Sequence, residues 1–159
     1  MALSPTPTLD AADLAILDIL QRDNTVSQRE IAAAVHLSPP AVQRRIQRLR
    51  DSGIIRAELA ILDGARLGHP LTLIVSVRVH DEHPRHTEPL RKRILAEPAV
   101  QQCYTVTGES DFVLVIAAAT MPHYEAITDR LFGGDDNVAR FQTSVALNCL
   151  KAGFQIPLA

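Results

Sequence analysis

The sequence predicts an α+β protein with an N-terminal winged helix-turn-helix domain and a C-terminal ferredoxin-like βαββαβ domain. Two helix start signals follow one another closely within residues 27–53, and from residue 71 onward strand-like and helix-like segments alternate. Between these halves, residues 62–70 contain two glycines and a proline and follow no periodicity. We therefore expect domains at residues 1–61 and 71–159, joined by a linker at 62–70. With 159 residues, 47% of them hydrophobic, the chain can bury two small cores.

Three N-terminal helices are expected from their capping residues. Asp10 suits the N-cap of a first helix. The apolar stripe of that helix consists of Leu14, Leu17 and Leu20. Ser27 and Glu30 have the spacing of a capping box, which predicts that a second helix begins at the next residue, Gln28. Ser38 as N-cap, followed by proline at the first helical position, predicts a third helix after a tight turn.

A wing is expected after the third helix. Gly53 suits the end of that helix. Residues 54–62, IIRAELAIL, then combine β-branched residues with partial alternation, which predicts a short hairpin or an extended wing.

The third helix has an apolar side and a basic side. At about 100° per residue, one stripe holds Val42, Ile46 and Leu49. The opposite side holds Pro40, Arg44, Gln47, Arg48 and Asp51. Residues 38–56 carry a net charge of +4, while residues 1–37 and 57–159 carry −3 each. A recognition helix in the major groove needs such a division, so the pattern predicts local binding to double-stranded DNA. The alternative is an arginine-rich helix that is merely solvated.

The second half of the chain has the strand and helix order of a ferredoxin-like domain. The expected strands are residues 71–79, 100–108, 112–119 and 138–150, and the expected helices are residues 87–97 and 121–132. Thr87 is the expected cap of the first of these helices, which carries Leu90, Ile94 and Leu95, and Tyr124, Ile127 and Leu131 are expected to point inward from the second. The segment FVLVIAAA at 112–119 is apolar on both faces, which predicts a central strand.

One strand also suggests self-association. Leu71, Leu73, Val75, Val77 and Val79 lie on one face of the strand at residues 71–79. Because a βαββαβ sheet has helices on only one side, we expect a homodimer formed through the C-terminal sheets.

These motifs resemble a known family. The segments LDAADLAIL and SQREIAAAVHLSPPAVQRRIQRLRDSGII, together with Gly108 and Asp111 in the turn between the second and third strands, are similar to the leucine-responsive/asparagine-responsive (Lrp/AsnC) transcription regulators. The resemblance covers nearly the whole chain. It implies a dimer, often a tetramer or octamer, whose C-terminal sheets associate and bind small effectors, commonly amino acids. Members usually have Leu-Glu where this chain has Leu49-Arg50.

The resemblance also assigns roles to residues of the third helix. It places Ser38, Pro40, Ala41 and Arg44 toward the bases, with Arg45 and Arg48 nearer the phosphates. Gln47 lies on the same polar side and completes the candidate DNA-binding set. Arg45 sits close to the apolar stripe, so a structural salt bridge to an acid of another helix is an equal alternative.

In the C-terminal domain, the resemblance implies an effector site at Gly108, Glu109, Asp111 and Thr143. Gly108 would let a ligand backbone approach, Asp111 would accept from an α-ammonium group, and Thr143 would hydrogen-bond the ligand. The alternative is that Gly108 makes a tight turn and Asp111 caps it.

Other classes of function lack support in the sequence. His80, His83 and His86 have HxxHxxH spacing, yet they span a strand end, a loop and a helix approach, which does not suit a metal site. No nucleophile stands beside a base, and no glycine-rich phosphate loop is present, so we expect neither an enzyme nor a cofactor. With no apolar run of eighteen residues or signal-like start, we expect a cytoplasmic protein without membrane partners. Two alternatives remain: an amino-acid-binding metabolic protein and an interaction protein that docks through its winged helix.

Overall fold

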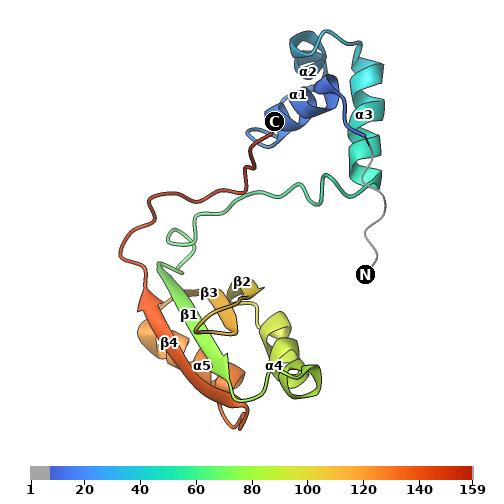
Figure 1. Ribbon diagram of the computed structural model, residues 1–159. Helices are drawn as coiled ribbons and strands as arrows, with labels where there is room; N and C mark the ends of the chain where they lie inside the picture. Colours follow the sequence, from blue (N-terminus) through green and yellow to red (C-terminus); the bar gives the residue numbers. More distant parts are fainter. Residues whose placement is uncertain (1–7, 159) are drawn as a thin grey trace. The chain divides into compact units, whose positions relative to one another are not determined.

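The computed structural model describes residues 8–158, which form two compact units (Figure 1). The first consists of residues 8–61 and 151–158, and the second of residues 62–150. The C-terminal segment, expected in the second domain, thus belongs to the first unit. The Ile156 N–H donates to Oε1 of Gln21 there, at 3.0 Å. Residues 62–70, expected as a linker, are part of the second unit and fold into turns.

The first unit contains the three expected helices. They are α1 (Ala11–Leu20), α2 (Gln28–Ala34) and α3 (Pro39–Asp51). The buried core consists of Ile16, Ile31, Ala32, Val42, Ile46 and Leu49. The apolar stripe predicted for α3 is therefore confirmed. The stripe predicted for α1 is wrong in part: its leucines are only half-buried, whereas Ile16 and Asp13 have no exposed surface. A carboxylate occupies the buried face because α3 supplies cations to it.

Local hydrogen bonds account for the helix boundaries. Capping boxes begin α1 at Asp10 and α2 at Ser27, both as expected. The turn between α2 and α3 places His36 in the left-handed region at φ 55°, and the N–H of Leu37 donates to the Ala32 carbonyl at 3.0 Å. This is the Schellman arrangement, which usually has glycine at the left-handed position. Ser38 is the N-cap of α3, but its side chain makes no capping hydrogen bond.

The expected wing does not form a hairpin. Residues 54–62 contain no strand, and Leu59, Ile61 and Leu62 are 77%, 83% and 70% exposed. Arg50 at the end of α3 pairs with Glu58 of this segment at 2.6 Å. The partial alternation has no strand to pair with in the described part of the first unit, so the segment remains extended.

The second unit is a four-stranded antiparallel sheet with two helices. Its elements are β1 (Leu71–Val79), α4 (Pro84–Ala96), β2 (Val100–Thr105), β3 (Phe112–Ala118), α5 (Met121–Phe132) and β4 (Val138–Val145). The strand order β2-β3-β1-β4 is that of a ferredoxin-like βαββαβ domain. The fold class predicted from the sequence is confirmed. β3 lies between β2 and β1, as its two apolar faces predicted.

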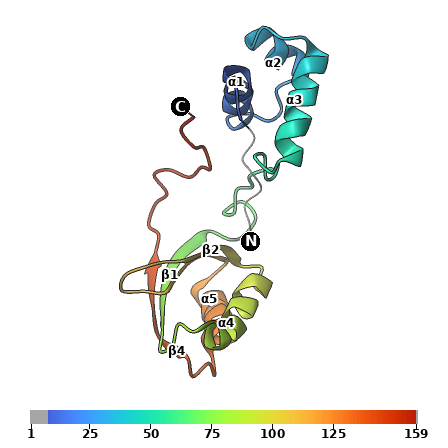
Figure 2. The same cartoon turned by 45° about the vertical axis from the view of Figure 1, so that its right-hand side comes forward.

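Both helices cover the same face of the sheet (Figure 2). The core beneath them includes Leu73, Val75, Val77 and Val79 of β1, all at most 6% exposed. The apolar face that we expected to form a dimer is therefore buried within the unit. The open face carries the alternate residues: Thr72, Ile74, Ser76 and Arg78 of β1, Val113, Val115 and Ala117 of β3, and Gln102 and Tyr104 of β2. Of these, Ile74 is 43% exposed and Tyr104 52%.

The N-terminus of α4 differs from the prediction. His83 rather than Thr87 is the N-cap, and its Nδ1 accepts from the Arg85 N–H at 3.2 Å. Thr87 lies one turn inside and is buried, with its hydroxyl donating to the Pro84 carbonyl. Leu95, expected on the apolar face, is 83% exposed. Pro84 at the first helical position supplies a start signal that outweighs the later threonine.

Candidate DNA-binding helix and effector site

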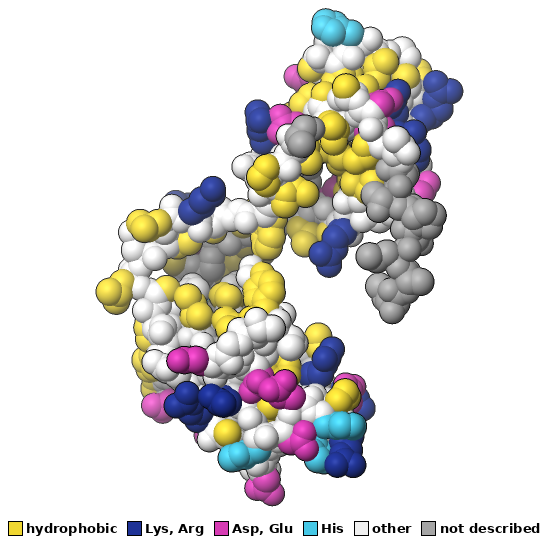
Figure 3. Space-filling model, viewed as in Figure 1, with side chains coloured by type: hydrophobic (Ala, Val, Ile, Leu, Met, Phe, Trp, Pro, Cys, Tyr) yellow, Lys and Arg dark blue, Asp and Glu magenta, His cyan; other side chains and the backbone are white. Residues whose placement is uncertain are grey.

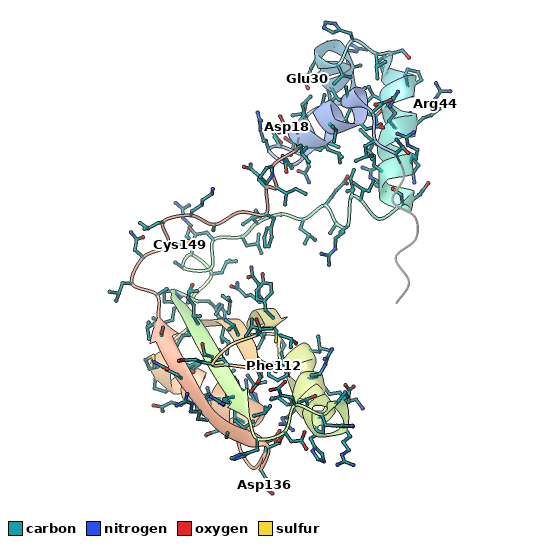
Figure 4. The ribbon with its side chains drawn as sticks, in the orientation of Figure 1. Asp18, Glu30, Arg44, Phe112, Asp136 and Cys149 are labelled. Atoms are coloured by element: carbon teal, nitrogen blue, oxygen red, sulfur yellow. The ribbon has the colours of Figure 1, made fainter. Side chains whose placement is uncertain are left out.

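The polar side of α3 is exposed along most of its length. Ser38, Pro40, Gln43, Arg44 and Gln47 are exposed, and Ala41 is half-buried. The Arg44 side chain points away from the helix unit (Figure 4). In the space-filling view, basic side chains gather along the α3 side of the first unit (Figure 3). This side can meet a polyanion while the opposite side packs into the core.

Two of the α3 arginines are held by a buried acid. Asp13 of α1 accepts from Nη1 of Arg45 at 2.8 Å and from Nη2 of Arg48 at 2.5 Å. Arg45 also contacts the Asp10 carboxylate at 2.7 Å. The side chain of Asp13 is 1% exposed, against 26% for Arg45 and 49% for Arg48. The salt bridge considered for Arg45 therefore exists, and Arg48 takes part in it as well.

This cluster perturbs two ionisable groups. The Asp13 N–H and the Arg45 guanidinium donate to the Asp10 carboxylate and lower its pKa. The hydrogen bonds from Arg45 to Asp13 and Asp10 raise the pKa of the guanidinium. Both groups remain charged across the physiological range, so the cluster fixes α3 against α1 at neutral pH.

The end of α3 has its own pairs. The Gln47 amide donates to Asp51 one turn later at 2.7 Å, and Arg50 pairs with Glu58. Among the candidate DNA-binding residues, Arg44 is thus a cation with no partner in the described part of the chain, since the ion pairs of α3 there run from Arg45, Arg48 and Arg50.

In the second unit, Asp111 already has structural partners. Its N–H donates to the Val77 carbonyl at 2.9 Å, and its Oδ2 accepts from the Val79 N–H at 2.7 Å. Gly108 has φ +120°, a conformation that side chains disfavour, although a Cβ there would meet nothing within 4 Å. Glu109 is exposed, and its carbonyl lies 3.5 Å from Nη1 of Arg78. The hydrogen bonds of Asp111 and the positive φ of Gly108 therefore support the alternative that these two residues form the turn.

Thr143 lies away from that turn. Its hydroxyl is hydrogen-bonded to the Tyr124 hydroxyl of α5, on the face of the sheet that the helices cover. Burial raises the pKa of Tyr124, so the phenol stays protonated at neutral pH. Thr143 on β4 and Asp111 before β3 flank β1 from opposite sides. Within this chain, the four expected effector residues do not converge on one pocket.

An open hollow of about 840 Å³ lies elsewhere in the second unit. Its walls include His69, His123, Arg93, Arg130 and Leu67. The two imidazole rings stand edge to face with centroids 6.1 Å apart. Sequence reasoning missed this feature because its residues come from four separate segments.

The histidines of the HxxHxxH motif have separate local roles. His83 caps α4, and Nδ1 of His86 lies 2.6 Å from Oδ2 of Asp81. The N–H of His83 and the imidazole of His86 lower the pKa of Asp81. Within residues 8–158, no three His, Cys, Asp or Glu side chains are grouped as metal ligands would be.

Comparison with known proteins decides the family. The family model for the Lrp/AsnC ligand binding domain matches residues 72–156, and that for a winged helix-turn-helix DNA-binding domain matches residues 9–56. The chain belongs to the Lrp/AsnC family. The match to the winged model spans the three helices and ends at residue 56, within the wing segment that forms no hairpin here.

Relatives match over almost the full length. An HTH-type transcriptional regulator of Sinorhizobium fredii is 37% identical over 150 residues, covering 94% of this chain and 89% of the relative. The leucine-responsive regulatory protein of Rhizobium meliloti is 28% identical, covering 94% and 96%. A Neisseria meningitidis transcriptional regulator, solved with L-methionine, has a TM-score of 0.87 at 27% identity and covers 94% and 97%.

With a DNA-binding helix-turn-helix and a ligand-binding domain of this family, the chain is a DNA-binding transcriptional regulator. No helix among the described residues is both long and apolar enough to cross a membrane.

Proposed function

We propose that this regulator binds operator DNA through α3 as a homodimer and changes its assembly or affinity in response to an amino acid. The observation that carries the DNA contact is the exposed basic side of α3, whose reverse side is buried as Val42, Ile46 and Leu49. Arg44 is the principal base reader of the set, since a guanidinium without partners can bind guanine O6 and N7 together.

The other α3 residues take supporting roles. Ser38 and Pro40 lie at the N-terminal end, which enters the groove first, with Ala41 beside them. Gln47 keeps its carbonyl oxygen available while its amide donates to Asp51. Arg48 keeps half of its side chain exposed and supplies charge near the phosphates, whereas Arg45 mainly orients α3 through Asp13.

Removal of Arg44 tests the DNA contact. Arg44→Ala is expected to weaken operator binding by about 1–3 kcal/mol and to relax the preference at one base position. Fluorescence anisotropy with an operator selected from random duplexes measures this, and affinity should fall steeply with salt through counterion release. Equal binding by wild type and Arg44→Ala contradicts the role of Arg44 as base reader. Binding without salt dependence contradicts the DNA contact itself and favours docking on another protein.

The homodimer is proposed on the open face of the sheet rather than on the apolar face of β1. Ile74 and Tyr104 expose large side chains there, next to the half-buried Val113 and Val115. A second copy would cover this face and hold two α3 helices for half-sites about one DNA turn apart. Light scattering at micromolar concentration should give a dimer or a multiple of it, such as a tetramer or octamer; a monomer contradicts this part.

The effector is proposed to be an amino acid. The Neisseria meningitidis relative was solved with L-methionine, and the ligand-binding family model covers residues 72–156 here. We retain the Gly108–Asp111 turn and Thr143 as candidate contacts of the effector. Because the turn and Thr143 lie apart within one protomer, we propose that the assembled oligomer completes the site. A thermal-shift screen of the twenty amino acids should find one that stabilises the protein, by about 2.7 kcal/mol at a hundred times its Kd.

The proposal assigns no enzymatic activity, because its relatives are regulators. It places the protein in the cytoplasm, the compartment expected for a DNA-binding regulator of this family.

A further inference from the structure

The N-terminal end of α3 lacks free N–H groups. Pro39 and Pro40 have no N–H, and the N–H of Ala41 donates to the Ser38 carbonyl at 2.9 Å. Helix ends that bind phosphate do so through free backbone N–H groups. The first three residues of α3 therefore offer no backbone N–H to a phosphate, and the exposed ring of Pro40 there suits contact with a base edge better than contact with phosphate.

One stripe of α3 continues from this tip. Pro40, Gln43, Arg44 and Gln47 follow the spacing i, i+3, i+4, i+7 and lie on one side of the helix. Across the described residues, the side chains of α3 engaged in hydrogen bonds or ion pairs are those of Arg45, Gln47, Arg48, Arg50 and Asp51. Gln43 and Arg44 belong to none of these pairs, and both are exposed.

Each member of the stripe has a preferred base. A glutamine amide pairs in bidentate fashion with N6 and N7 of adenine, and a guanidinium with O6 and N7 of guanine. Apolar groups contact the thymine methyl. We propose that Gln43 reads an adenine in the major groove beside the base bound by Arg44, and that Pro40 contacts a thymine methyl. This inference rests on the proposed DNA contact of α3 and adds a specificity-determining residue to it.

Substitution of Gln43 should affect DNA binding differently from substitution of the arginines. A neutral amide releases no counterions, so its removal alters the base preference and leaves the salt dependence of binding unchanged. Glutamate at the same position has only acceptors and favours the N4 amino group of cytosine. The variant Gln43→Glu therefore switches a preference instead of merely weakening it.

The experiment selects duplexes from a random library with the full chain and three variants. Wild type should enrich a half-site with adenine at one position. Gln43→Ala should lower that preference by about tenfold, and Gln43→Glu should shift it to cytosine. Gln155→Ala, the same change at an exposed glutamine of the C-terminal segment, should enrich the wild-type half-site. Thermal melting confirms that each variant is folded.

A second arm tests Pro40. Deoxyuridine replaces thymine, one position at a time, in the selected half-site, and one replacement should weaken wild-type binding a few fold. No loss at any thymine overturns the Pro40 contact. An unchanged half-site with both Gln43 variants overturns the role of Gln43 while leaving DNA binding by α3 intact. A wild-type chain that binds no duplex overturns the proposed function as well.

Discussion

In the first unit Arg44 projects into solvent and pairs with none of the described residues, whereas in the second unit Asp111 already accepts the Val79 N–H and Thr143 already bonds Tyr124. A surface helix can keep one side free for a ligand because its backbone hydrogen bonds are satisfied within the helix. Asp111, just before β3, serves the neighbouring strand β1, whose outer N–H groups need acceptors, and Thr143 within β4 bonds a side chain of the helix that covers the sheet. Before any ligand binds, the candidate DNA-binding residue Arg44 thus has no structural role within the described part of the chain, whereas the candidate effector residues Asp111 and Thr143 already stabilise the fold.

The contrast also runs within α3. Arg44 has no ion-pair partner among residues 8–158, while Arg45 and Arg48 neutralise the buried Asp13. Three arginines within five positions thus divide into one that faces outward and two that connect helices. Mutations that separate recognition from stability should follow this division.

The largest expected effect concerns the Asp13 cluster. The double variant Arg45→Ala/Arg48→Ala leaves the Asp13 carboxylate buried without a cation, which should lower the free energy of unfolding by about 3 kcal/mol. This value is at the lower end of the cost of breaking a buried ion pair, because both arginines are partly exposed. Urea unfolding followed by far-UV circular dichroism measures it. Arg44→Ala is the matched control and should stay within about 0.5 kcal/mol of wild type. Equal stability of the double variant and Arg44→Ala would contradict the structural role of Arg45 and Arg48.

The next effect separates the two duties of Asp111. Asp111→Ala removes the acceptor of the Val79 N–H and should cost about 1.5–3 kcal/mol. Asp111→Asn keeps an acceptor oxygen without the charge, so it should lose less stability. If the carboxylate binds an α-ammonium group, calorimetry of Asp111→Asn should detect no binding of the amino acid that stabilises wild type. The operator affinity of this variant should stay within a few fold of the wild-type value. Unchanged amino-acid affinity would leave Asp111 as a turn residue.

The smallest effect tests the capping box of α2. Ser27→Ala removes the side chain that accepts from the Glu30 N–H and should cost about 1 kcal/mol, while Ser27→Thr keeps the cap. Hydrogen bonds from the Ser27 hydroxyl and N–H lower the pKa of Glu30 below its ordinary 4.5. A depressed pKa means that this stabilisation is present above about pH 4.5 and is lost as pH falls through the folded value. Thermal melts from pH 3 to 7 should therefore show the gap between Ser27→Ala and wild type narrowing in acid; a constant gap would contradict the role of Glu30.

The sequence by itself predicted the features that depend on short-range patterns. The capping box at Ser27 and Glu30, the buried stripe of α3 and the bounds of β1 and α5 all agree with the structure. Each depends on residues a few positions apart, through helical or strand periodicity and local capping. The central place of β3 was predictable too, since its two apolar faces required cover on both sides.

The tertiary structure decided which polar groups are free. That Asp13 is buried against two arginines thirty-two and thirty-five positions away could not be read from α1, where an acid looks like a solvated residue. Likewise, the apolar face of β1 was known, but only the placement of α4 and α5 showed that it lies under the helices. The extended course of residues 54–62 had the same origin, because a strand requires a partner strand as well as a suitable sequence. Periodicity specifies which side of an element is apolar, whereas the distant element that satisfies or covers that side is set by the packing of the whole unit.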